Sequence, residues 1–300
     1  MSSPSSSPLK AVIFMLIACL FMASTTLIAK TLGNSGVLGP DATKLSPFMV
    51  TAARFFFAAG VWIIVWKISG RRLQSPDYSL HLKRTVLGWA TVTLIFAASA
   101  KMILADATAI SFLNPLVAMV LAVFMLGEKV GPVRWFAAAV MILGAVILIQ
   151  PGSDAFQLAA LLALGAAFTG GVEVIYIKQL TNREPLLQVL LVNNLMGLCL
   201  ALIPLWFIWS WPTQAQWLLL VMVGLCMATA QLFFISAIKG AEASFVTPFM
   251  YSTLLFAALL DFMVFGALPT SIGLLGALIV VSGAILLAWR EGLAQRRSSR

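Results

Sequence analysis

The sequence predicts an all-α integral membrane protein whose ten transmembrane helices form two inverted five-helix repeats. Its mean hydropathy is +1.03 and only 10% of its residues are charged, against roughly 25% in an average soluble domain. The motif SFLNPL at residues 111–116 returns as SFVTPF at residues 244–249. Two glycines 17 residues apart also recur, first as Gly127 and Gly144 and then as Gly266 and Gly283. Because each copy holds an odd number of spans, the second copy crosses the membrane in the opposite sense.

Ten apolar stretches approach the roughly 20 residues that a helix needs to cross a bilayer. In order along the first half they are residues 11–32, 46–67, 86–102, 104–126 and 134–150. The second half supplies residues 156–178, 186–207, 215–237, 243–265 and 271–289. We therefore expect a first repeat over residues 10–150 and a second repeat over residues 151–290.

The two ends of the chain are expected to form tails in the cytoplasm. The start of the chain is rich in Ser and Pro, and the helix that follows is too long for the apolar core of a signal peptide and lacks a small-residue cleavage pattern. We therefore expect residues 1–9 to form a disordered tail, and residues 291–300 to form a basic tail.

The distribution of basic residues predicts the orientation. Of the 19 Lys and Arg residues, only Lys30, Lys44 and Lys101 fall on the side opposite the termini, and Arg54 lies within a span. The positive-inside rule therefore places both termini in the cytoplasm, in a multi-pass protein of the cytoplasmic (inner) membrane. The remaining basic residues alternate with the spans, so the net charge of +9 needs no nucleic acid as partner.

The sequence carries no motif of an enzyme or a metal site. Cys19, Cys199 and Cys226 lie in separate spans, so we interpret them as packing residues rather than as a disulfide framework or a CxxC metal site. The single histidine, His81, is expected in a polar inner connection. We therefore expect no enzyme activity, no cofactor and no metal. Without nucleotide hydrolysis, concentrative transport would draw on an ion gradient or on substrate exchange.

Several short motifs, taken in order, resemble one transporter family. They are ADATAISF at residues 105–112 followed by Pro115, LGEKVGP at 126–132, Trp135, Pro151 with Gly152, PFMY at 248–251 and FGALP at 265–269. This arrangement is similar to the EamA-type branch of the drug/metabolite transporter superfamily, over about residues 10–290. The chain departs from that pattern at Ala267, where the family commonly has Glu, and at Asp261, where it has a small residue.

The resemblance implies a ten-helix carrier with a central cavity between its two halves. Members of the family move amino acids, S-adenosylmethionine, riboflavin, metal-chelating metabolites and drugs, some inward and some outward. We therefore expect a secondary transporter of a small organic metabolite (amino acid-like, nucleoside- or vitamin-like, or metallophore-like) that works by alternating access, linked to protons or to exchange. A drug or toxic-metabolite efflux pump and a channel-like facilitator stay open as alternatives. The expected partners are the substrate and membrane lipid, and the protein is expected to be a monomer or a homodimer.

Basic side chains within spans mark candidate functional positions, since a charge in the bilayer needs a partner or water. Arg54 in the second span is a candidate for binding a carboxylate or phosphate of the substrate. Alternatively, it braces helix ends by pairing with carbonyl groups or with Asp41, Asp106 or Asp261. Lys30 lies near the outer end of the first span, where its side chain is expected to extend toward the membrane surface.

Two acidic side chains within spans are candidates for proton coupling. Glu173 directly follows a pair of glycines, and burial there would favour binding of a proton. Alternatively, Glu173 pairs with Lys178 or Arg134 at the inner face. Asp261 lies near the outer end of the ninth span, where it binds a proton, is hydrated, or pairs with Lys30 or Lys101.

Uncharged polar side chains within spans predict the wall of the cavity, because an unpaired amide in hydrocarbon is costly. The substrate-binding candidates among them are Thr26, Asn114, Asn194, Gln231 and Tyr251. Pro115 and Pro248 interrupt the backbone at equivalent places in the two halves, which is typical of a transporter's central site. We therefore expect the substrate between the first, fourth, sixth and ninth spans, in contact with Asn114, Gln231 and Tyr251.

Overall fold

The structure is a computed structural model of the chain. It describes residues 8–34, 38, 43–114, 116–118, 120–121, 131–149, 158–181, 183–240 and 247–298. These residues form helices joined by short connections, and none of them lies in a strand. The predicted all-α class is therefore confirmed.

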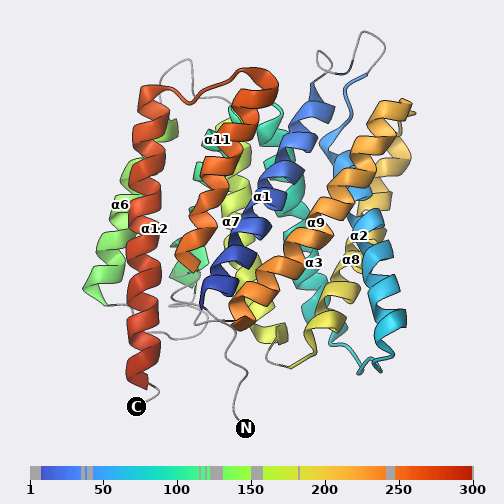
Figure 1. Cartoon of the computed structure of the whole chain (residues 1–300), viewed down its shortest axis with the longest axis horizontal. Coiled ribbons are helices and arrows are strands. Elements are labelled where there is room, and N and C mark those ends of the chain that lie inside the picture. Colours follow the sequence, from blue (N-terminus) through green and yellow to red (C-terminus); the bar gives the residue numbers. More distant parts are fainter. Residues whose placement is uncertain are drawn as a thin grey trace.

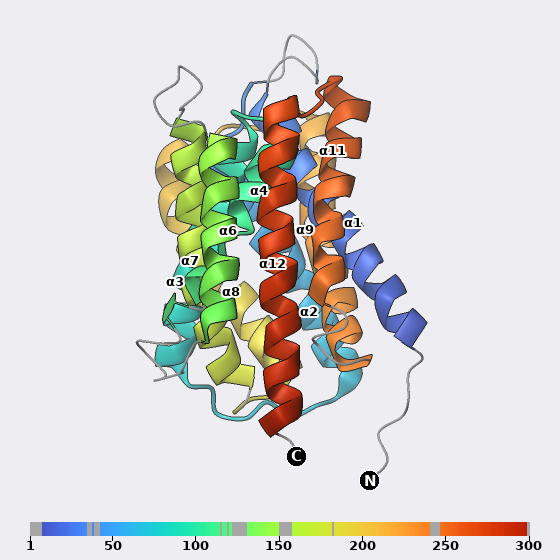
Figure 2. The same ribbon diagram turned by 90° about the vertical axis from the view of Figure 1, so that its left-hand side faces the viewer.

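The helices follow the predicted spans in order. In the first half they are α1 (Pro8–Gly33), α2 (Pro47–Ser69), α3 (Tyr78–Ser99), α4 (Leu104–Ser111) and α6 (Pro132–Ile149). In the second half they are α7 (Leu158–Thr181), α8 (Leu186–Ile208), α9 (Gln214–Gly240), the 3-10 turn η1 (Thr247–Tyr251), α11 (Ser252–Phe265) and α12 (Ser271–Ser298). They run side by side along one bundle, and α1 begins at the end of the bundle where α12 finishes (Figure 1, Figure 2).

Five of the described helices contain segments long and apolar enough to cross a membrane. These segments are Leu9–Gly33, Pro47–Ser69, Leu158–Ile177, Leu186–Ile208 and Gln214–Phe234. Shorter apolar helical segments accompany them at Trp135–Ile147, Phe249–Phe265 and Ser271–Gly283. Large apolar side chains such as Phe56, Trp206 and Leu255 point away from the bundle. A bundle that is apolar on its outside is suited to lipid as its solvent.

Local signals set the two ends of α2. The Ser46 side chain accepts a hydrogen bond from the Phe48 N–H (3.4 Å), and Pro47 occupies the first helical position. Gly70 ends the helix with φ of 61°, a left-handed conformation that favours glycine. Gly266 ends α11 in the same way, with φ of 63°.

Helix α3 begins at Tyr78, earlier than the predicted start at residue 86. The Asp77 side chain caps it by accepting a hydrogen bond from the Leu80 N–H (3.1 Å). His81 and Arg84 therefore lie inside α3, where both are buried. The expectation that His81 lies in a polar connection is wrong, because a hydropathy average scores polar residues as solvated even where the fold pairs and buries them.

The packing of the helices follows the predicted inverted repeat. Helix α1 packs against α9 and α11, and its counterpart in the second half, α7, packs against their counterparts α3 and α4. Helix α2 packs against its own counterpart α8, and α6 packs against α12. Each contact that a helix of the first half makes with the second half therefore has a matching contact between the two counterpart helices. Inverted repeats require this correspondence.

Gly144 of α6 and Gly283 of α12 let these two helices approach closely. A Cβ atom on Gly144 would lie 2.7 Å from the backbone nitrogen of Val280 in α12. A Cβ atom on Gly283 would lie 3.0 Å from the backbone oxygen of Ala137 in α6. Two of the four repeated glycines therefore lie in the interface between α6 and α12, where small residues favour helix association in lipid.

Replacing Gly144 by Ala is expected to lower the thermal midpoint of unfolding in detergent, because the added methyl group meets the backbone of α12. Overpacking of this kind costs about 1–3 kcal/mol. Gly60→Ala is the matched control, since nothing lies within 4 Å of a Cβ atom at Gly60 and Ala favours a helix. Circular dichroism measures both midpoints, and equal values would contradict close packing of α6 on α12.

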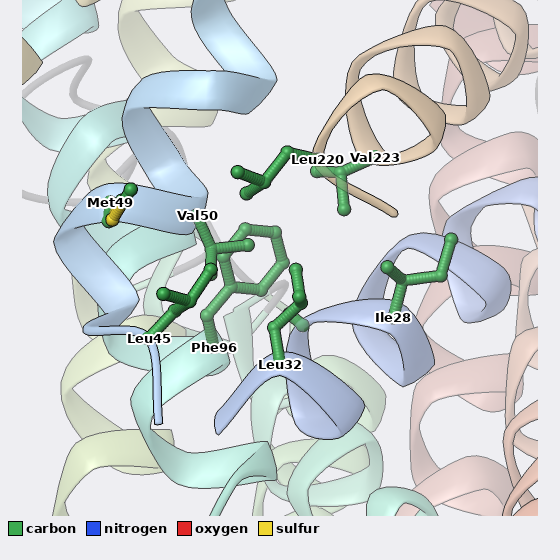
Figure 3. Packing of buried hydrophobic residues seen from close by; sticks show 9 residues of the cluster. Ile28, Leu32, Leu45, Met49, Val50, Phe96, Leu220 and Val223 are labelled. Atoms are coloured by element: carbon green, nitrogen blue, oxygen red, sulfur yellow. The ribbon is translucent and has the colours of Figure 1, made fainter. Parts of the chain in front are cut away.

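A cluster of apolar side chains joins four helices at the end of the bundle opposite the termini. Figure 3 shows this cluster, which comprises Ile28 and Leu32 of α1, Leu45 before α2, Met49 and Val50 of α2, Phe96 of α3, and Leu220 and Val223 of α9. Because lipid is itself apolar, close packing rather than exclusion of water stabilises such a cluster. Lys30 lies between Ile28 and Leu32 along α1, in the helical turn that this cluster packs.

Candidate functional site

Three charged side chains meet inside the bundle, between α2, α3 and α7. Arg54 of α2 and Arg84 of α3 are buried, at 4% and 6% relative exposure. The Nε atom of Arg84 lies 3.6 Å from Oε1 of Glu173 in α7, and Arg54 interacts electrostatically with both groups. We call these three residues the charged cluster. It contains two guanidinium groups and one carboxylate.

A glycine in α3 provides the space for the Glu173 carboxylate. A Cβ atom on Gly88 would lie 2.6 Å from Glu173 Oε1, so the carboxylate rests against bare backbone. Gly88 follows Arg84 by four residues and therefore lies on the same face of α3. This face thus supplies both the cation that pairs with Glu173 and the space that Glu173 occupies.

The glycine pair before Glu173 serves a different purpose. A Cβ atom on Gly171 would lie 2.7 Å from the Asn114 backbone oxygen and 2.6 Å from Val117 Cβ. A Cβ atom on Gly170 would lie 3.7 Å from Asn114 Nδ2. Gly171 therefore lets the fourth span approach α7 closely.

The charged cluster has hydrogen-bond donors without acceptors. Within the described part of the chain, Arg54 Nε and Arg84 Nε are buried and make no hydrogen bond. Arg84 is held by its Nη1, which donates to the Val189 carbonyl of α8 (3.3 Å), and the Arg54 guanidinium lies 4.3 Å from the centroid of the Phe55 ring. Buried polar groups are usually paired, so these unpaired donors make the cluster a candidate binding site.

A buried ion pair joins the two halves at the end opposite the termini. Lys30 Nζ of α1 lies 2.6 and 2.8 Å from the two carboxylate oxygens of Asp261 in α11. The Leu104 N–H donates to the same carboxylate (2.9 Å), and the Phe265 ring centroid lies 4.7 Å from Lys30 Nζ. Pairing of Asp261 with Lys30, one of the expected alternatives, is confirmed. The expectation that Lys30 extends toward the membrane surface is wrong, because Asp261 neutralises its charge inside the bundle.

A second carboxylate, Asp106, lies near this pair in the first turn of α4. It interacts electrostatically with Asp261 and Lys30, and its Oδ1 atom is buried without a hydrogen-bond partner among the described residues. A Cβ atom on Gly273 of α12 would lie 3.0 Å from this oxygen. The structure therefore places Asp106 with the Lys30–Asp261 pair.

At the end where the termini lie, the connection between α2 and α3 is tied to α8. The Glu184 carboxylate accepts hydrogen bonds from the Asp77 N–H (2.8 Å) and from His81 Nε2 (2.8 Å). Gln188 donates to Glu184 (2.7 Å) and accepts from the Gln74 N–H (2.7 Å). We call these five residues the Glu184 clasp. It joins the first half to the second half.

The clasp determines the ionisation of Glu184. Burial by itself would raise the pKa of Glu184, but hydrogen bonds from Asp77, His81 and Gln188 lower it below its ordinary value of 4.5. A carboxylate whose pKa is lowered by folding stabilises the folded state above its ordinary pKa, and this stabilisation is lost as the pH falls through the folded pKa. The clasp is therefore intact at neutral pH and weakens in acid.

The fourth and ninth spans are both interrupted, as the paired prolines predict. Helix α4 ends at Ser111 and helix resumes at Asn114, while the 3-10 turn η1 precedes α11. Tyr251 at the end of η1 is 8% exposed, and its ring meets that of Phe112 edge-on, with 5.0 Å between the centroids. The two interruptions therefore lie next to each other. Pro115 lies outside the described residues.

The other uncharged binding candidates take part in helix packing or bond to their own helix. Gln231 of α9 accepts a hydrogen bond from Trp62 Nε1 of α2 (3.2 Å). Asn194 donates to the Leu190 carbonyl within α8 (2.8 Å), and its Oδ1 is buried without a partner among the described residues. The Thr26 hydroxyl donates to the carbonyl one turn earlier in α1 (3.2 Å). Gln231 thus lies between α2 and α9, whereas Asn114 and Tyr251 lie at the interruptions.

Arg84 is a site residue that the hydropathy pattern assigned to a connection. The sequence does indicate that Arg84 lies in a helix. His81, Arg84, Thr85 and Gly88 are spaced so that they lie on one face of a helix. Thr85 donates to Asn193 of α8 (3.2 Å), so this face of α3 is polar and buried over two turns. Polar residues at helical spacing next to a span therefore indicate that the helix continues.

The structure gives the partner of Glu173 as Arg84, with Arg54 nearby. Pairing of Glu173 with Lys178 or Arg134 involves side chains outside the described ones. Neither of the expected roles of Glu173, proton binding or structural pairing, is excluded by this arrangement, because a carboxylate held by a cation still titrates.

The described residues include no group of three His, Cys, Asp or Glu side chains placed to hold a metal ion. All three cysteines are free. Cys19 is buried in an apolar cluster with its Sγ 3.5 Å from the Phe249 carbonyl, which agrees with a packing role.

Comparison with known proteins finds one family and several named transporters. The sequence profile of the EamA-like transporter family matches residues 9–150 and, separately, residues 157–289. A protein of Vibrio cholerae serotype O1 named "Riboflavin transporter" is 32% identical over 231 residues, which cover 75% of this chain and 76% of that protein. An "S-adenosylmethionine uptake transporter" of Rickettsia felis is 25% identical over 256 residues, covering 85% and 87%.

Two further similarities are more distant. The "Pseudopaline exporter CntI" of Pseudomonas aeruginosa is 24% identical over 228 residues, which cover 75% of this chain and 80% of that protein. Among the solved structures that match, a crystal structure has a TM-score of 0.62 at 19% identity, covering 92% of this chain and 96% of the matched chain. At that identity the match shows a likeness of fold alone.

Proposed function

Because the chain belongs to the EamA-like transporter family, we propose that it is a secondary transporter that moves a small organic metabolite across the cytoplasmic membrane by alternating access. The relatives support a small-molecule substrate, since their names specify riboflavin, S-adenosylmethionine and pseudopaline. They are named as transporters and not as enzymes. The chain is a multi-pass membrane protein, and the two profile matches support repeats over residues 10–150 and 151–290.

The observation that carries this proposal is a buried charged cluster with ties between the halves at both ends of the bundle. The Lys30–Asp261 pair lies at one end and the Glu184 clasp at the other. A transporter that alternates access opens the contacts at one end while it keeps those at the other. Both ties join the first half to the second, so each would have to open, together with the packing beside it, before that side of the membrane reached the space between the halves.

We place proton coupling at Glu173, with Asp261 as the second candidate. A membrane interior disfavours an ionised carboxylate, whereas the Arg84 guanidinium, 3.6 Å from the Glu173 carboxylate, favours it. A movement of α7 relative to α3 changes that balance, so Glu173 would bind a proton on one side of the membrane and release it on the other. Asp261 is held by Lys30 and by the Leu104 N–H, so it would take up a proton only when that pair opens.

Transport by the purified protein in proteoliposomes tests the proposed function. Saturable flux of riboflavin, S-adenosylmethionine or another metabolite is expected, driven by a pH gradient or by substrate on the opposite side. Because one relative is named as an exporter, both directions are measured. Flux that rises without saturation would indicate a channel-like facilitator. Absence of flux for every compound in a broad metabolite set would contradict transport.

Tyr251→Ala and Asn114→Ala are each expected to raise KM for transport about tenfold, the loss expected when one polar or aromatic contact to the substrate is removed. The reason is their position at the paired interruptions of the fourth and ninth spans. Tyr78→Ala is a matched control, since Tyr78 is 67% exposed at the start of α3. Unchanged KM in both variants, at normal expression, would place the substrate elsewhere.

The orientation is a separate prediction, based on the basic residues. A reporter fused after Arg300 and one inserted near Arg72 are expected to read as cytoplasmic, and one inserted near Pro212 is expected to read as external. A cysteine-labelling or enzyme reporter in intact cells measures each position. An external signal from the fusion after Arg300 would contradict an even number of spans with both termini inside.

A further inference from the structure

Two buried guanidinium groups in the charged cluster share one carboxylate. With all three groups ionised, Arg54 and Arg84 contribute two positive charges and Glu173 contributes one negative charge. An uncompensated charge inside a membrane protein is costly, so such a charge usually has a partner or contacts water. The excess positive charge is therefore the feature of this site that needs an explanation.

Among the described residues, Glu173 is the one acidic side chain that lies against the two guanidinium groups. Helix α8, which packs on α2 and α3, contributes the neutral amide of Asn193, which bonds to Thr85. His81, one turn before Arg84 in α3, points to the Glu184 clasp, where Glu184 is already engaged by hydrogen bonds. The second buried ion pair lies elsewhere, and Asp261 there is neutralised by Lys30.

The two guanidinium groups of the charged cluster lack some of the hydrogen bonds that they can donate. Arg84 Nε lies 3.6 Å from Glu173 Oε1, which is longer than the roughly 2.7–2.9 Å of a charge-assisted hydrogen bond. Arg84 Nε and Arg54 Nε are buried without hydrogen-bond partners among the described residues. A guanidinium group presents several N–H donors in a planar fork that matches the oxygens of a carboxylate or a phosphate.

We infer that the transported molecule carries an anionic carboxylate or phosphate group, and that this group binds to Arg54 and Arg84 beside Glu173. The inference rests on the proposed transport function and adds the chemical class of the substrate. A bound monoanion brings the cluster to zero net charge and supplies the acceptors that both Nε atoms lack. Glu173 opposes the anion by like-charge repulsion, so protonation of Glu173 strengthens anion binding. By linkage, anion binding strengthens proton binding at Glu173 to the same degree.

The inference is tested first with small anions. Sodium phosphate and sodium acetate are compared with sodium chloride at equal ionic strength, on the full-length protein in nanodiscs of zwitterionic lipid, by the shift in thermal midpoint. Phosphate or acetate is expected to stabilise the protein more than chloride does. Glu173→Gln, which removes the repelling charge, is expected to enlarge that shift. Because this is a gain, a folding defect cannot produce it. Absence of any difference between the anions in both proteins would overturn the inference.

Matched pairs of organic ligands then identify the anionic group. Riboflavin is compared with riboflavin 5′-phosphate, and S-adenosylmethionine with its methyl ester, so that each pair differs by one anionic group. For at least one pair, the anionic member is expected to bind at least about tenfold more tightly, as the loss of a charge-assisted hydrogen bond implies. Arg54→Gln and Arg84→Gln are expected to remove this preference, whereas Arg72→Gln at an exposed position is expected to keep it.

The outcomes separate this inference from the proposed function. Saturable flux of a neutral compound, with no preference for anionic members and no effect of Arg54→Gln, would overturn the anionic substrate and leave transport intact. Anion binding that depends on the two arginines, without flux of any compound, would contradict transport. Competition of anionic lipid added to the nanodiscs with the anionic probe would show that a lipid headgroup, not a substrate, occupies the cluster, which also overturns the inference.

Discussion

Asp261→Ala is expected to lower the free energy of unfolding by about 3–5 kcal/mol, the cost of leaving a buried charge without its partner. Lys30 and Asp261 are 7% and 0% exposed, so water cannot replace the lost carboxylate. The Leu104 N–H at the start of α4 also loses its acceptor. The measurement is chemical or thermal unfolding in detergent, followed by tryptophan fluorescence.

A double variant separates the charge from the fold. Lys30→Met combined with Asp261→Asn is expected to recover most of the lost stability, because neither residue is then charged and Asn still accepts from the Leu104 N–H. Arg183→Ala is the matched control, because its ion pair with Asp77 is exposed and such pairs contribute at most about 1 kcal/mol. If Asp261→Ala unfolds like the wild type, the Lys30–Asp261 pair does not stabilise the fold.

The same double variant tests the pair as a tie between the halves. It folds without an ion pair between α1 and α11, so any change in its transport reports on opening at that end of the bundle. We expect a changed rate of exchange with an intact substrate affinity, since the charged cluster lies in other helices. A loss of affinity equal to the loss of rate would indicate that the pair contacts the substrate.

The architecture was predictable from the sequence because it depends on local composition. A helix in lipid satisfies its own backbone, so the length and position of an apolar stretch suffice to find it. The glycine pair at Gly144 and Gly283 was visible as part of a repeat, although its reciprocal packing depends on how α6 and α12 lie together. The early start of α3 was not visible in hydropathy, because the residues that extend it are polar.

The charged cluster was harder to predict because its members come from helices far apart in the sequence. Arg54 and Glu173 stood out as charges within spans, but Arg84, the cation that pairs with Glu173, lies where an apolar stretch is only beginning. The sequence left both Lys30 and Lys101 as possible ion-pair partners of Asp261. The packing of α1 against α11 brings Lys30, and not Lys101, to Asp261. Polar residues on one face of a helix narrow the choice of partner, as His81 and Thr85 do beside Arg84.

Glu173→Gln is expected to abolish accumulation driven by a pH gradient, while exchange continues and substrate binding is kept or is strengthened by the loss of the repelling charge. The amide keeps the shape of the carboxylate beside Gly88 but cannot carry a proton across the membrane. With one proton per substrate molecule and the membrane potential clamped, a gradient of one pH unit sustains about tenfold accumulation of a neutral complex. The variant is expected to reach a ratio of about one under the same gradient.

Counterflow in proteoliposomes provides the control for this prediction. Exchange of labelled for unlabelled substrate needs no net proton movement, so Glu173→Gln is expected to exchange at a rate similar to that of the wild type. Failure of both accumulation and exchange would point to a structural role, since Glu173 also pairs with Arg84 between α3 and α7. Accumulation at the wild-type level would remove Glu173 from coupling. Asp261 would then be the remaining proposed proton-binding residue within the spans, and opening of its pair with Lys30 would be the step that couples protons to transport.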